Sequence, residues 1–340
     1  GGTGSGAASV ARIARETQQL VSSLEEIDGK LSTAKDSKEV ATLQRRRADV
    51  VEKLIDGSEN AMERDTWVRQ LVDMLSVGAQ TGVYPEAVAR LKSVSRDLAG
   101  SDEALKSYAD FQAISTEYVV RQTPDADFAE VQKWYLDSLS RFVESSPRTA
   151  EAAQAWMQLG HSKEFEDKEE DALEFYKRVA TTFPGTDAGE KAAGAVRRLE
   201  SVGQTVDLSG KTINGKPFRL SGLRGKPVVV HYWATWCEPC KQDMKLLRRL
   251  QAAYQRQGLQ LVGVNVDVTR EQAGDFLKQN QLPWTQLFEP GGLESSSLAK
   301  ALGVQTLPTM LLVDADGKVV RHNVRAAELQ GELNKMLGRK

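Results

Sequence analysis

Residues 227–241, PVVVHYWATWCEPCK, contain Cys237 and Cys240, the only two cysteines among 340 residues. The β-branched run that ends in aromatic residues predicts a buried strand, and KQDMKLLRRLQAAYQRQG after it has apolar residues at helical spacing. We therefore expect Cys237 where the strand ends and the helix begins, and unpaired amides and the helix dipole favour a thiolate there. Pro239 fits the first helical turn, which needs no amide hydrogen, and Cys240 is close enough to form a disulfide with Cys237.

Two other roles are open to the cysteine pair. Buried cysteines are often inert packing residues, but packing does not require two of them at this spacing on such a turn. A metal site would need further ligands, and the only histidines are His161, His231 and His322, with His231 inside the predicted strand. The sequence therefore favours a redox-active disulfide, with no metal and no other cofactor.

The composition limits the classes of function. With 45 basic and 47 acidic residues the formal net charge is −2, so the charge predicts no binding to nucleic acid or to an anionic membrane surface. No apolar run approaches the length needed to cross a bilayer. The chain opens with GGTGSG in place of a signal peptide, and we expect that any export signal or anchor was removed or was never present. This length predicts two or more domains.

Residues 1–124 are predicted to be helical. Apolar residues recur at spacings of three and four from Leu20 to Leu31, and the pattern resumes after a turn at residues 35–37. It predicts an antiparallel helical hairpin or a short coiled coil. Such a hairpin is either the edge of an ordinary bundle or an element for self-association, and the sequence leaves both open.

Residues 125–202 contain an internal repeat. YLDSLSRFVESSPRTAEAAQAW aligns with ALEFYKRVATTFPGTDAGEKAA at a period of 37 residues, from Pro147 to Pro184. Both copies place small residues at helical spacing after Pro-x-Thr, which lets paired helices approach closely. The period is near that of tetratricopeptide repeats, and the segment resembles that family loosely. A packing role and a surface for a peptide or partner protein both fit the pattern.

From residue 203 to 340 the chain alternates between strands and helices. A hairpin is expected around the turn signals Ser209-Gly210 and Asn214-Gly215. The other expected elements are strands at 227–233, 259–266, 309–313 and 318–321 and helices at 238–256, 270–280, 294–302 and 326–337. This order predicts an α/β domain with a mixed central sheet and helices on both faces, after the all-helical region.

Four motifs occur in order within residues 203–338: GKTINGKPFRL, GKPVVVHYWATWCEPCK, LVGVNVDV and TLPTMLLVDADGKVV. By these motifs the domain resembles the TlpA/ResA-like branch of the thioredoxin fold. The resemblance implies extracytoplasmic thiol–disulfide exchange, commonly the reduction of protein disulfides at the expense of a thiol electron donor. It says nothing about the helices that precede it.

The resemblance assigns roles around the cysteines. Cys237 matches the attacking cysteine and Cys240 the resolving one. Trp236 and Pro239 match the residues that shield and stiffen the active-site turn. Trp236 is thereby expected to belong to the surface that meets the substrate.

Three further residues follow from the resemblance. Pro308 matches the cis-proline that faces the disulfide, and Leu307 before it would offer backbone groups to an extended substrate. Asp243 matches a family carboxylate, usually Glu, on the helix that carries the cysteines. One turn beyond Cys240, it can take the proton from Cys240 during resolution. The alternative is a solvated acid on the helix surface.

Two residues are expected to tune the reactivity of the thiols. His231 occupies a strand position that is often Asn in this family; buried and neutral it would be inert, and protonated it would favour the thiolate. Glu238 lies between the cysteines, and its charge opposes thiolate formation. A very strong oxidant is therefore not expected.

Three functions fit the sequence: a dithiol reductase of exported proteins, an oligomeric disulfide isomerase or oxidase, and a non-enzymatic assembly protein whose thioredoxin-like domain docks a partner. The intact cysteine pair with Pro308 and Asp243 argues against the third. The family resemblance favours the first. Its partners would be protein disulfides and a thiol donor, while the helical region binds a second copy or another protein. We expect residues 203–340 to fold alone and residues 1–200 to serve association.

Overall fold

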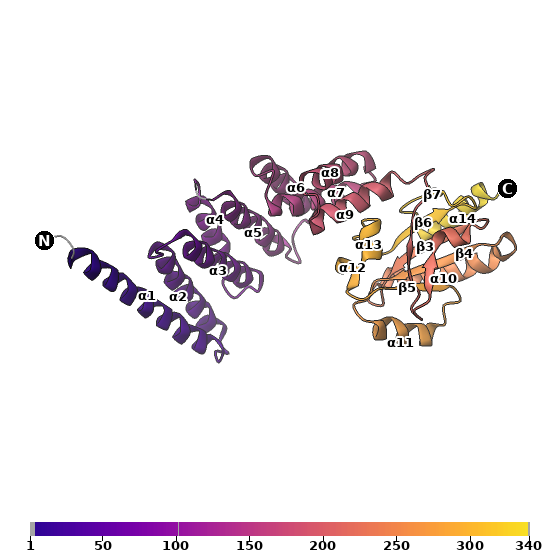
Figure 1. Cartoon of the computed structure of the whole chain (residues 1–340). Helices are drawn as coiled ribbons and strands as arrows, with labels where there is room; N and C mark the ends of the chain where they lie inside the picture. The colour runs from indigo at the N-terminus through magenta and orange to yellow at the C-terminus, as the bar shows by residue number, and fades with distance from the viewer. Residues whose placement is uncertain (1–3, 101, 339–340) are drawn as a thin grey trace. The chain divides into compact units, whose positions relative to one another are not determined.

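The computed structural model describes residues 4–100 and 102–338 and divides into two compact units, Gly1–Leu159 and Gly160–Lys340 (Figure 1). The first three residues of the GGTGSG opening lie outside the described part. The second unit contains the predicted α/β domain together with the helices that directly precede it. The domain boundary at residue 203 suggested by the sequence stays a prediction about independent folding.

The described residues of the first unit fold into helices, as predicted. An Asp or Asn side chain accepts backbone N–H groups at the start of several of them: Asp36, Asn60, Asp102 and Asp127. The elements are α1 (Gly4–Leu31), α2 (Ser37–Asp56), α3 (Ala61–Gln80), α4 (Ala87–Asp97), α5 (Glu103–Arg121), α6 (Phe128–Ser145) and α7 (Ala150–Phe165), which runs on into the second unit. The turn expected at 35–37 separates α1 from α2, which pack together as a hairpin.

None of the helices in residues 4–100 and 102–338 combines the length and apolar character needed to span a membrane.

The internal repeat forms helices joined by similar turns. Pro147 lies in the turn between α6 and α7, and Pro184 in the turn between α8 (Glu169–Thr182) and α9 (Asp187–Leu199). The small residues of both copies are buried, with Ala152 and Ala192 at 0% exposure. A packing role for these residues is therefore confirmed, whereas the likeness to tetratricopeptide repeats stays a resemblance.

A five-stranded mixed sheet forms the centre of the second unit, in the order β5-β4-β3-β6-β7. Strands β3, β4 and β5 are parallel, and β6 and β7 are antiparallel to their neighbours. The elements are β1 (Ser209–Lys211), β2 (Pro217–Arg219), β3 (Val228–Trp233), α10 (Glu238–Ala253), β4 (Gln260–Asn265), α11 (Arg270–Asn280), β5 (Thr285–Phe288), α12 (Gly292–Ser295), α13 (Ser297–Ala301), β6 (Thr309–Val313), β7 (Val319–Arg321) and α14 (Ala326–Met336). The α/β fold and its mixed sheet are confirmed.

Three details differ from the sequence prediction. The single helix expected at 294–302 is two short helices, α12 and α13, because Ser296 ends the first and caps the second with its side chain. Ser209 and Gly210 lie inside β1 instead of forming a turn; the hairpin turns at Asn214-Gly215, where Gly215 has a φ of 80°. The edge strand β5 was not predicted, because it is only 4 residues long and its second residue is polar. That residue, Gln286, is nevertheless buried, because its side chain accepts a hydrogen bond from the indole of Trp233 at 2.9 Å.

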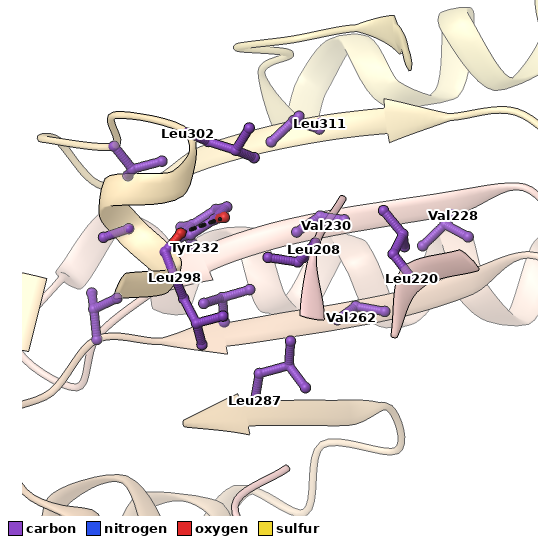
Figure 2. Close-up of a cluster of buried hydrophobic side chains, with 14 of the residues drawn as sticks. Leu208, Leu220, Val228, Val230, Tyr232, Val262, Leu287, Leu298, Leu302 and Leu311 are labelled. Atoms are coloured by element: carbon purple, nitrogen blue, oxygen red, sulfur yellow. Dashed lines mark hydrogen bonds between the residues drawn. The ribbon is translucent and has the colours of Figure 1, made fainter. Parts of the chain in front are cut away.

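Both faces of the sheet are covered, which is why every residue of β3 is buried. On one face Val230 and Tyr232 pack with Leu208 and Leu298, and the Tyr232 hydroxyl donates to the Leu298 carbonyl at 3.0 Å (Figure 2). On the other face, residues of β3 pack with the apolar sides of α10 and α14. This second core contains both cysteines and fixes the start of α10 at the end of β3.

Helix α9 is joined closely to the α/β fold, at a contact that we call the α9 seam (α9 against residues 300–303). A Cβ atom on Gly194 would overlap the carbonyl oxygen of Lys300, and one on Gly303 would overlap the backbone of α9. The backbones therefore touch directly, which only glycine allows. Beyond the seam, the Gly203 N–H donates to the Val319 carbonyl at 2.8 Å. Helix α9 is thus packed onto the α/β fold.

Candidate active site

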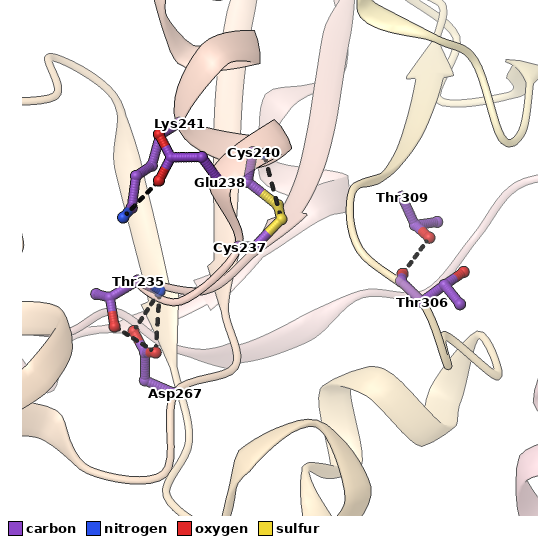
Figure 3. The surroundings of a disulfide bond; sticks show 8 residues. All are labelled: Thr235, Cys237, Glu238, Cys240, Lys241, Asp267, Thr306 and Thr309. Atoms are coloured by element: carbon purple, nitrogen blue, oxygen red, sulfur yellow. Dashed lines mark hydrogen bonds and ion pairs between the residues drawn. A yellow bond between two sulfur atoms is a disulfide. The ribbon is translucent and has the colours of Figure 1, made fainter. Parts of the chain in front are cut away.

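The two cysteines form a disulfide at the start of α10, with their Cα atoms 5.3 Å apart (Figure 3). Cys237 is the N-cap of the helix, and its sulfur accepts a hydrogen bond from the Cys240 N–H at 3.2 Å. Cys237 is 5% exposed and Cys240 is fully buried. The position predicted for Cys237 is confirmed, and the amide that faces its sulfur would stabilise a thiolate there.

The loop before the cysteines is held by Asp267, a residue that was not predicted to belong to the site. The buried carboxylate accepts the Thr235 N–H at 3.0 Å and the Thr235 hydroxyl at 2.8 Å (Figure 3). Asn265 Nδ2 donates to it at 2.7 Å. The sequence NVDV, at the carboxyl end of β4, could have identified Asp267. Because β4 is parallel to β3, polar residues at this end of β4 lie beside the end of β3, where the cysteine loop begins.

The residues that flank the sulfurs are open to solvent. Trp236 is 61% exposed, an unusual state for so large an apolar side chain, and Pro239 is also exposed. The Glu238 carboxylate pairs with Lys241 at 3.1 Å, and its side chain is 70% exposed. Water and Lys241 both screen the negative charge of Glu238, so its effect on a thiolate is small.

The loop that faces the disulfide contains the peptide bond Leu307–Pro308, which is cis, as the resemblance implies. The loop is braced where β6 begins, because the Thr309 hydroxyl donates to the Thr306 carbonyl at 2.8 Å (Figure 3). Leu307 packs against both cores of the α/β fold. The loop is therefore a fixed surface beside the cysteines.

Asp243 lies one helical turn beyond Cys240 and is only partly exposed. Burial raises the pKa of its carboxyl from 3.8 to about 6. This value does not suit a freely solvated acid, and it allows a proton to be taken up and released near neutral pH.

His231 is buried in β3, and among the described residues neither of its ring nitrogens has a hydrogen-bond partner. Burial lowers its pKa to about 3, so the ring is neutral at physiological pH. A positive charge on His231 is therefore not available to favour the thiolate.

A cavity of about 780 Å³ adjoins the active-site turn. On one side it is lined by Pro239, Asp243 and the Leu307–Pro308 loop, and on the other by residues of α7, α8 and α9, among them His161, Phe165 and Arg198. These helices were not predicted to lie at the active site. No local pattern could show it, because the residues on the two sides lie far apart in the chain.

Known proteins similar to this chain include several named as thiol-disulfide oxidoreductases. The AhpC/TSA family matches residues 202–322. The thiol-disulfide oxidoreductase ResA of Bacillus thuringiensis subspecies konkukian is 32% identical over 123 residues, which are 36% of this chain and 65% of that protein. ResA of Bacillus cereus is 31% identical over 127 residues, which are 36% of this chain and 71% of that protein. The chain belongs to the ResA-like thiol-disulfide oxidoreductases.

A solved thiol-disulfide oxidoreductase from Bacteroides fragilis is 28% identical to this ResA-like chain, with a TM-score of 0.36, over 38% of this chain and 97% of its own length. The chain spans 65% of the length of the first ResA relative. The AhpC/TSA match begins at residue 202, so the helices before it lie outside that match.

Proposed function

We propose that the protein is a thiol–disulfide oxidoreductase that reduces disulfides of exported proteins through Cys237 and Cys240. The observation that carries the proposal is the N-cap position of Cys237, whose sulfur faces the Cys240 N–H at 3.2 Å. A sulfur in that position is stabilised as a thiolate by the amide and by the helix dipole.

The proposed reaction starts from the dithiol. The Cys237 thiolate attacks one sulfur of the substrate disulfide, so a mixed disulfide forms and the other substrate sulfur leaves as a thiolate. Cys240 then loses its proton and attacks the Cys237 sulfur, which releases the second substrate sulfur. Two electrons have passed to the substrate, whose thiolates take up protons, and Cys237 and Cys240 are left as the disulfide. A thiol donor restores the dithiol.

Asp243 is proposed to accept the proton of Cys240 in the second step. With a pKa of about 6, its carboxyl is mostly ionised at neutral pH, yet it holds a proton more readily than a solvated Asp does. It lines the same cavity as Pro308, on the side where the mixed disulfide would form. The remaining alternative, a surface acid without a role, predicts exchange rates that do not respond to its removal.

Trp236, Leu307 and Pro308 are proposed to bind the substrate. Trp236 presents an exposed apolar surface next to Cys237. Among the described residues, the N–H of Leu307 donates to no other backbone group, so it is available to a substrate that lies beside the loop as an added strand. Pro239 stiffens the turn between the sulfurs.

Neutral His231 adds no positive charge that would stabilise the Cys237 thiolate, which fits a reductant better than a strong oxidant. Glu238 is screened by Lys241 and by water, so it changes this balance little. The resemblance to the TlpA/ResA-like branch supports a location outside the cytoplasm. Self-association or a partner protein for the helices of the first unit is a further proposal.

The reduction potential of the Cys237–Cys240 couple tests the proposed direction. Equilibration with defined ratios of reduced and oxidised glutathione, read by thiol alkylation and mass, gives the potential directly. A value near −270 mV supports a reductase, whereas a value near −120 mV would establish the oxidase alternative instead. If the protein reduces neither a small disulfide nor a protein disulfide, the alternative of a non-enzymatic protein that docks a partner would be supported instead.

A further inference from the structure

The cavity beside the active site has a second side that is not part of the thioredoxin fold. We call it the helical wall and define it as residues 161–165 of α7 with Arg198 of α9. It faces the side formed by Pro239, Asp243 and the Leu307–Pro308 loop. Any polypeptide that brings a disulfide to Cys237 along this cavity lies against the helical wall.

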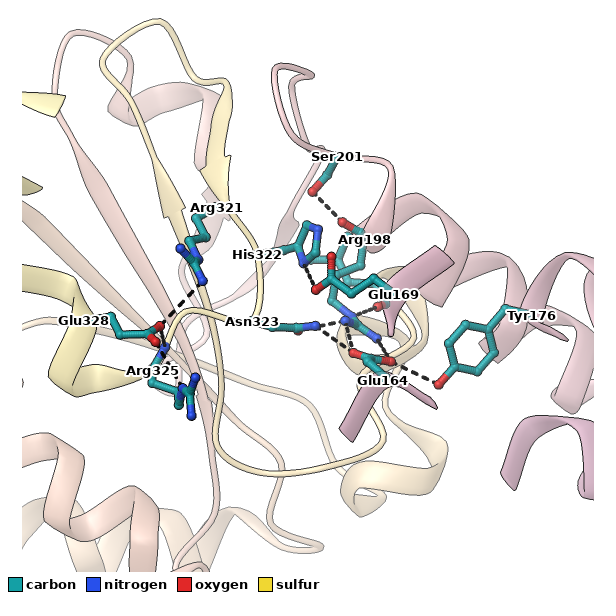
Figure 4. A network of polar contacts seen from close by, with 11 residues as sticks. Glu164, Glu169, Tyr176, Arg198, Ser201, Arg321, His322, Asn323, Arg325 and Glu328 are labelled. Atoms are coloured by element: carbon teal, nitrogen blue, oxygen red, sulfur yellow. Dashed lines mark hydrogen bonds and ion pairs between the residues drawn. The ribbon is translucent and has the colours of Figure 1, made fainter. Parts of the chain in front are cut away.

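The helical wall is fixed in place by a buried polar network (Figure 4). Arg198 is 3% exposed and donates to the carbonyl of Leu302 at 3.0 Å and to the side chain of Asn323 at 2.7 Å. Asn323 in turn donates to Glu164 at 2.7 Å, and the Tyr176 hydroxyl donates to the same carboxylate at 3.0 Å. Because these buried groups are hydrogen-bonded to one another, moving the helical wall would leave them without partners. The wall is therefore held in a fixed position relative to the α/β fold.

The charges along the cavity balance. Burial alone would raise the pKa of Glu164, but the hydrogen bond and charge of Arg198 outweigh it and lower the pKa, so the two form an ion pair. Burial lowers the pKa of His161, which is therefore neutral. At the edge of the cavity, Asp167 and Arg325 carry opposite charges. Apart from Asp243, the cavity offers no net charge by which a charged segment would be selected.

What the wall does offer is an apolar side chain. Phe165, the last residue of α7, lines the cavity and is 89% exposed. Contact between this exposed ring and an apolar group of a ligand removes apolar surface from water, which makes binding more favourable. On the same cavity, the side-chain Nε2 of Gln305 is buried without a hydrogen-bond partner among the described residues.

We propose that Phe165 is a specificity-determining residue, which binds an apolar side chain of an unfolded polypeptide next to the cysteine that Cys237 attacks. The inference rests on the proposed function. The occupant is a polypeptide because the proposed reaction brings a protein disulfide to Cys237, and a cavity of about 780 Å³ beside the active-site turn is far larger than the disulfide alone requires. It is an extended segment because the cavity runs along the loop that offers backbone groups for strand addition.

Short synthetic peptides that carry one cysteine, linked as a mixed disulfide to thionitrobenzoate, test the proposal with the full chain. Attack by Cys237 releases the coloured thionitrobenzoate, and attack by Cys240 then releases the peptide thiol. One peptide series carries Phe at successive positions beside the cysteine, and the matched series carries Ser. Dithiobisnitrobenzoate serves as the small disulfide that needs no wall.

Phe165→Ala should lower kcat/KM for the best Phe peptide roughly tenfold and leave the Ser peptides and dithiobisnitrobenzoate unchanged. Phe165→Leu should restore most of the loss. Phe128→Ala removes a side chain that is 65% exposed on α6, away from the cysteines in the chain, and should change none of the rates. Equal rates on Phe and Ser peptides in the unaltered protein, or equal losses on both in Phe165→Ala, would overturn the inference. If the unaltered protein reduces neither the peptides nor dithiobisnitrobenzoate, the proposed function itself is wrong.

Discussion

The active-site turn and the α9 seam both border the same cavity, but they depend on the sequence in opposite ways. The turn places its chemistry within a few consecutive residues, from Thr235 to Asp243. The seam joins groups that lie 104 residues apart, such as Arg198 and Leu302. The cysteine turn is thus encoded locally, whereas the helical wall proposed to meet the substrate depends on contacts that only the folded chain brings together.

Replacement of Cys237 should have the largest effect on activity, and it should do so without unfolding the protein. Cys237→Ser removes the attacking sulfur, so reduction of dithiobisnitrobenzoate should fall by at least about a thousandfold. The fold should survive, because Ser keeps the N-cap role at the start of α10. Turnover with the small disulfide and the far-ultraviolet dichroism of the same sample measure the two properties. A Cys237→Ser protein that keeps its turnover would refute the assignment.

A substitution in the seam should affect the fold instead of the sulfur chemistry. A Cβ atom on Gly194 would overlap the Lys300 carbonyl, so Gly194→Ala should lower the free energy of unfolding by about 3 kcal/mol. Gly274 in α11 has no neighbouring atom within 4 Å of a built Cβ, and Gly274→Ala should raise stability by roughly 0.5–1 kcal/mol. Urea unfolding of the reduced proteins compares them. Equal stabilities for the two variants would show that the close backbone contact at the α9 seam is absent in solution.

Two truncations test where the catalytic unit begins. The fragment 160–340 keeps the Arg198 network, whereas the fragment 203–340 loses it and leaves Asn323 without two partners. We expect both to reduce dithiobisnitrobenzoate, but the shorter fragment should be less stable by about 2–3 kcal/mol, or roughly 10 °C in Tm. Equal melting temperatures would favour the boundary at residue 203 that the composition suggests.

The smallest expected effect concerns Asp243 and depends on pH. The pKa of its carboxyl is 3.8 ordinarily and about 6 in the folded protein, so the folded state binds the proton more tightly. The ionised form therefore costs folding free energy above pH 6, and this cost vanishes as the pH falls below about 4. Asp243→Asn should stabilise the protein by on the order of 1 kcal/mol near neutral pH, after allowance for solvent screening, and by nothing at low pH.

The matched control for Asp243 is Asp316→Asn, at the exposed turn between β6 and β7. It should change stability equally little at both pH values. Asp243→Asn should also slow the release of peptide from the mixed disulfide at neutral pH by roughly tenfold. If Asp243→Asn releases the peptide as fast as the unaltered protein at neutral pH, Asp243 is a surface acid without a role in the reaction.

The fold of the second unit was largely predictable because its signals are local. The strand before the cysteines, the Thr269 cap of α11 and the DADG turn each follow from neighbouring residues. Strand β5 was missed because Gln286 looks like a surface residue until the indole of Trp233 is known to lie beside it. The helical wall was missed for the same reason, since Arg198 and Glu164 look like ordinary surface charges in a helical pattern.

In the proposed reaction Cys237 attacks the substrate and Cys240 resolves the intermediate. The most direct test is the mass of the complex formed when reduced Cys240→Ser protein meets an unfolded protein that contains a disulfide. The account predicts a stable covalent complex, and proteolysis with mass spectrometry should find the substrate cysteine on Cys237. A complex that forms instead through Cys240 in the Cys237→Ser protein, with none in Cys240→Ser, would contradict it.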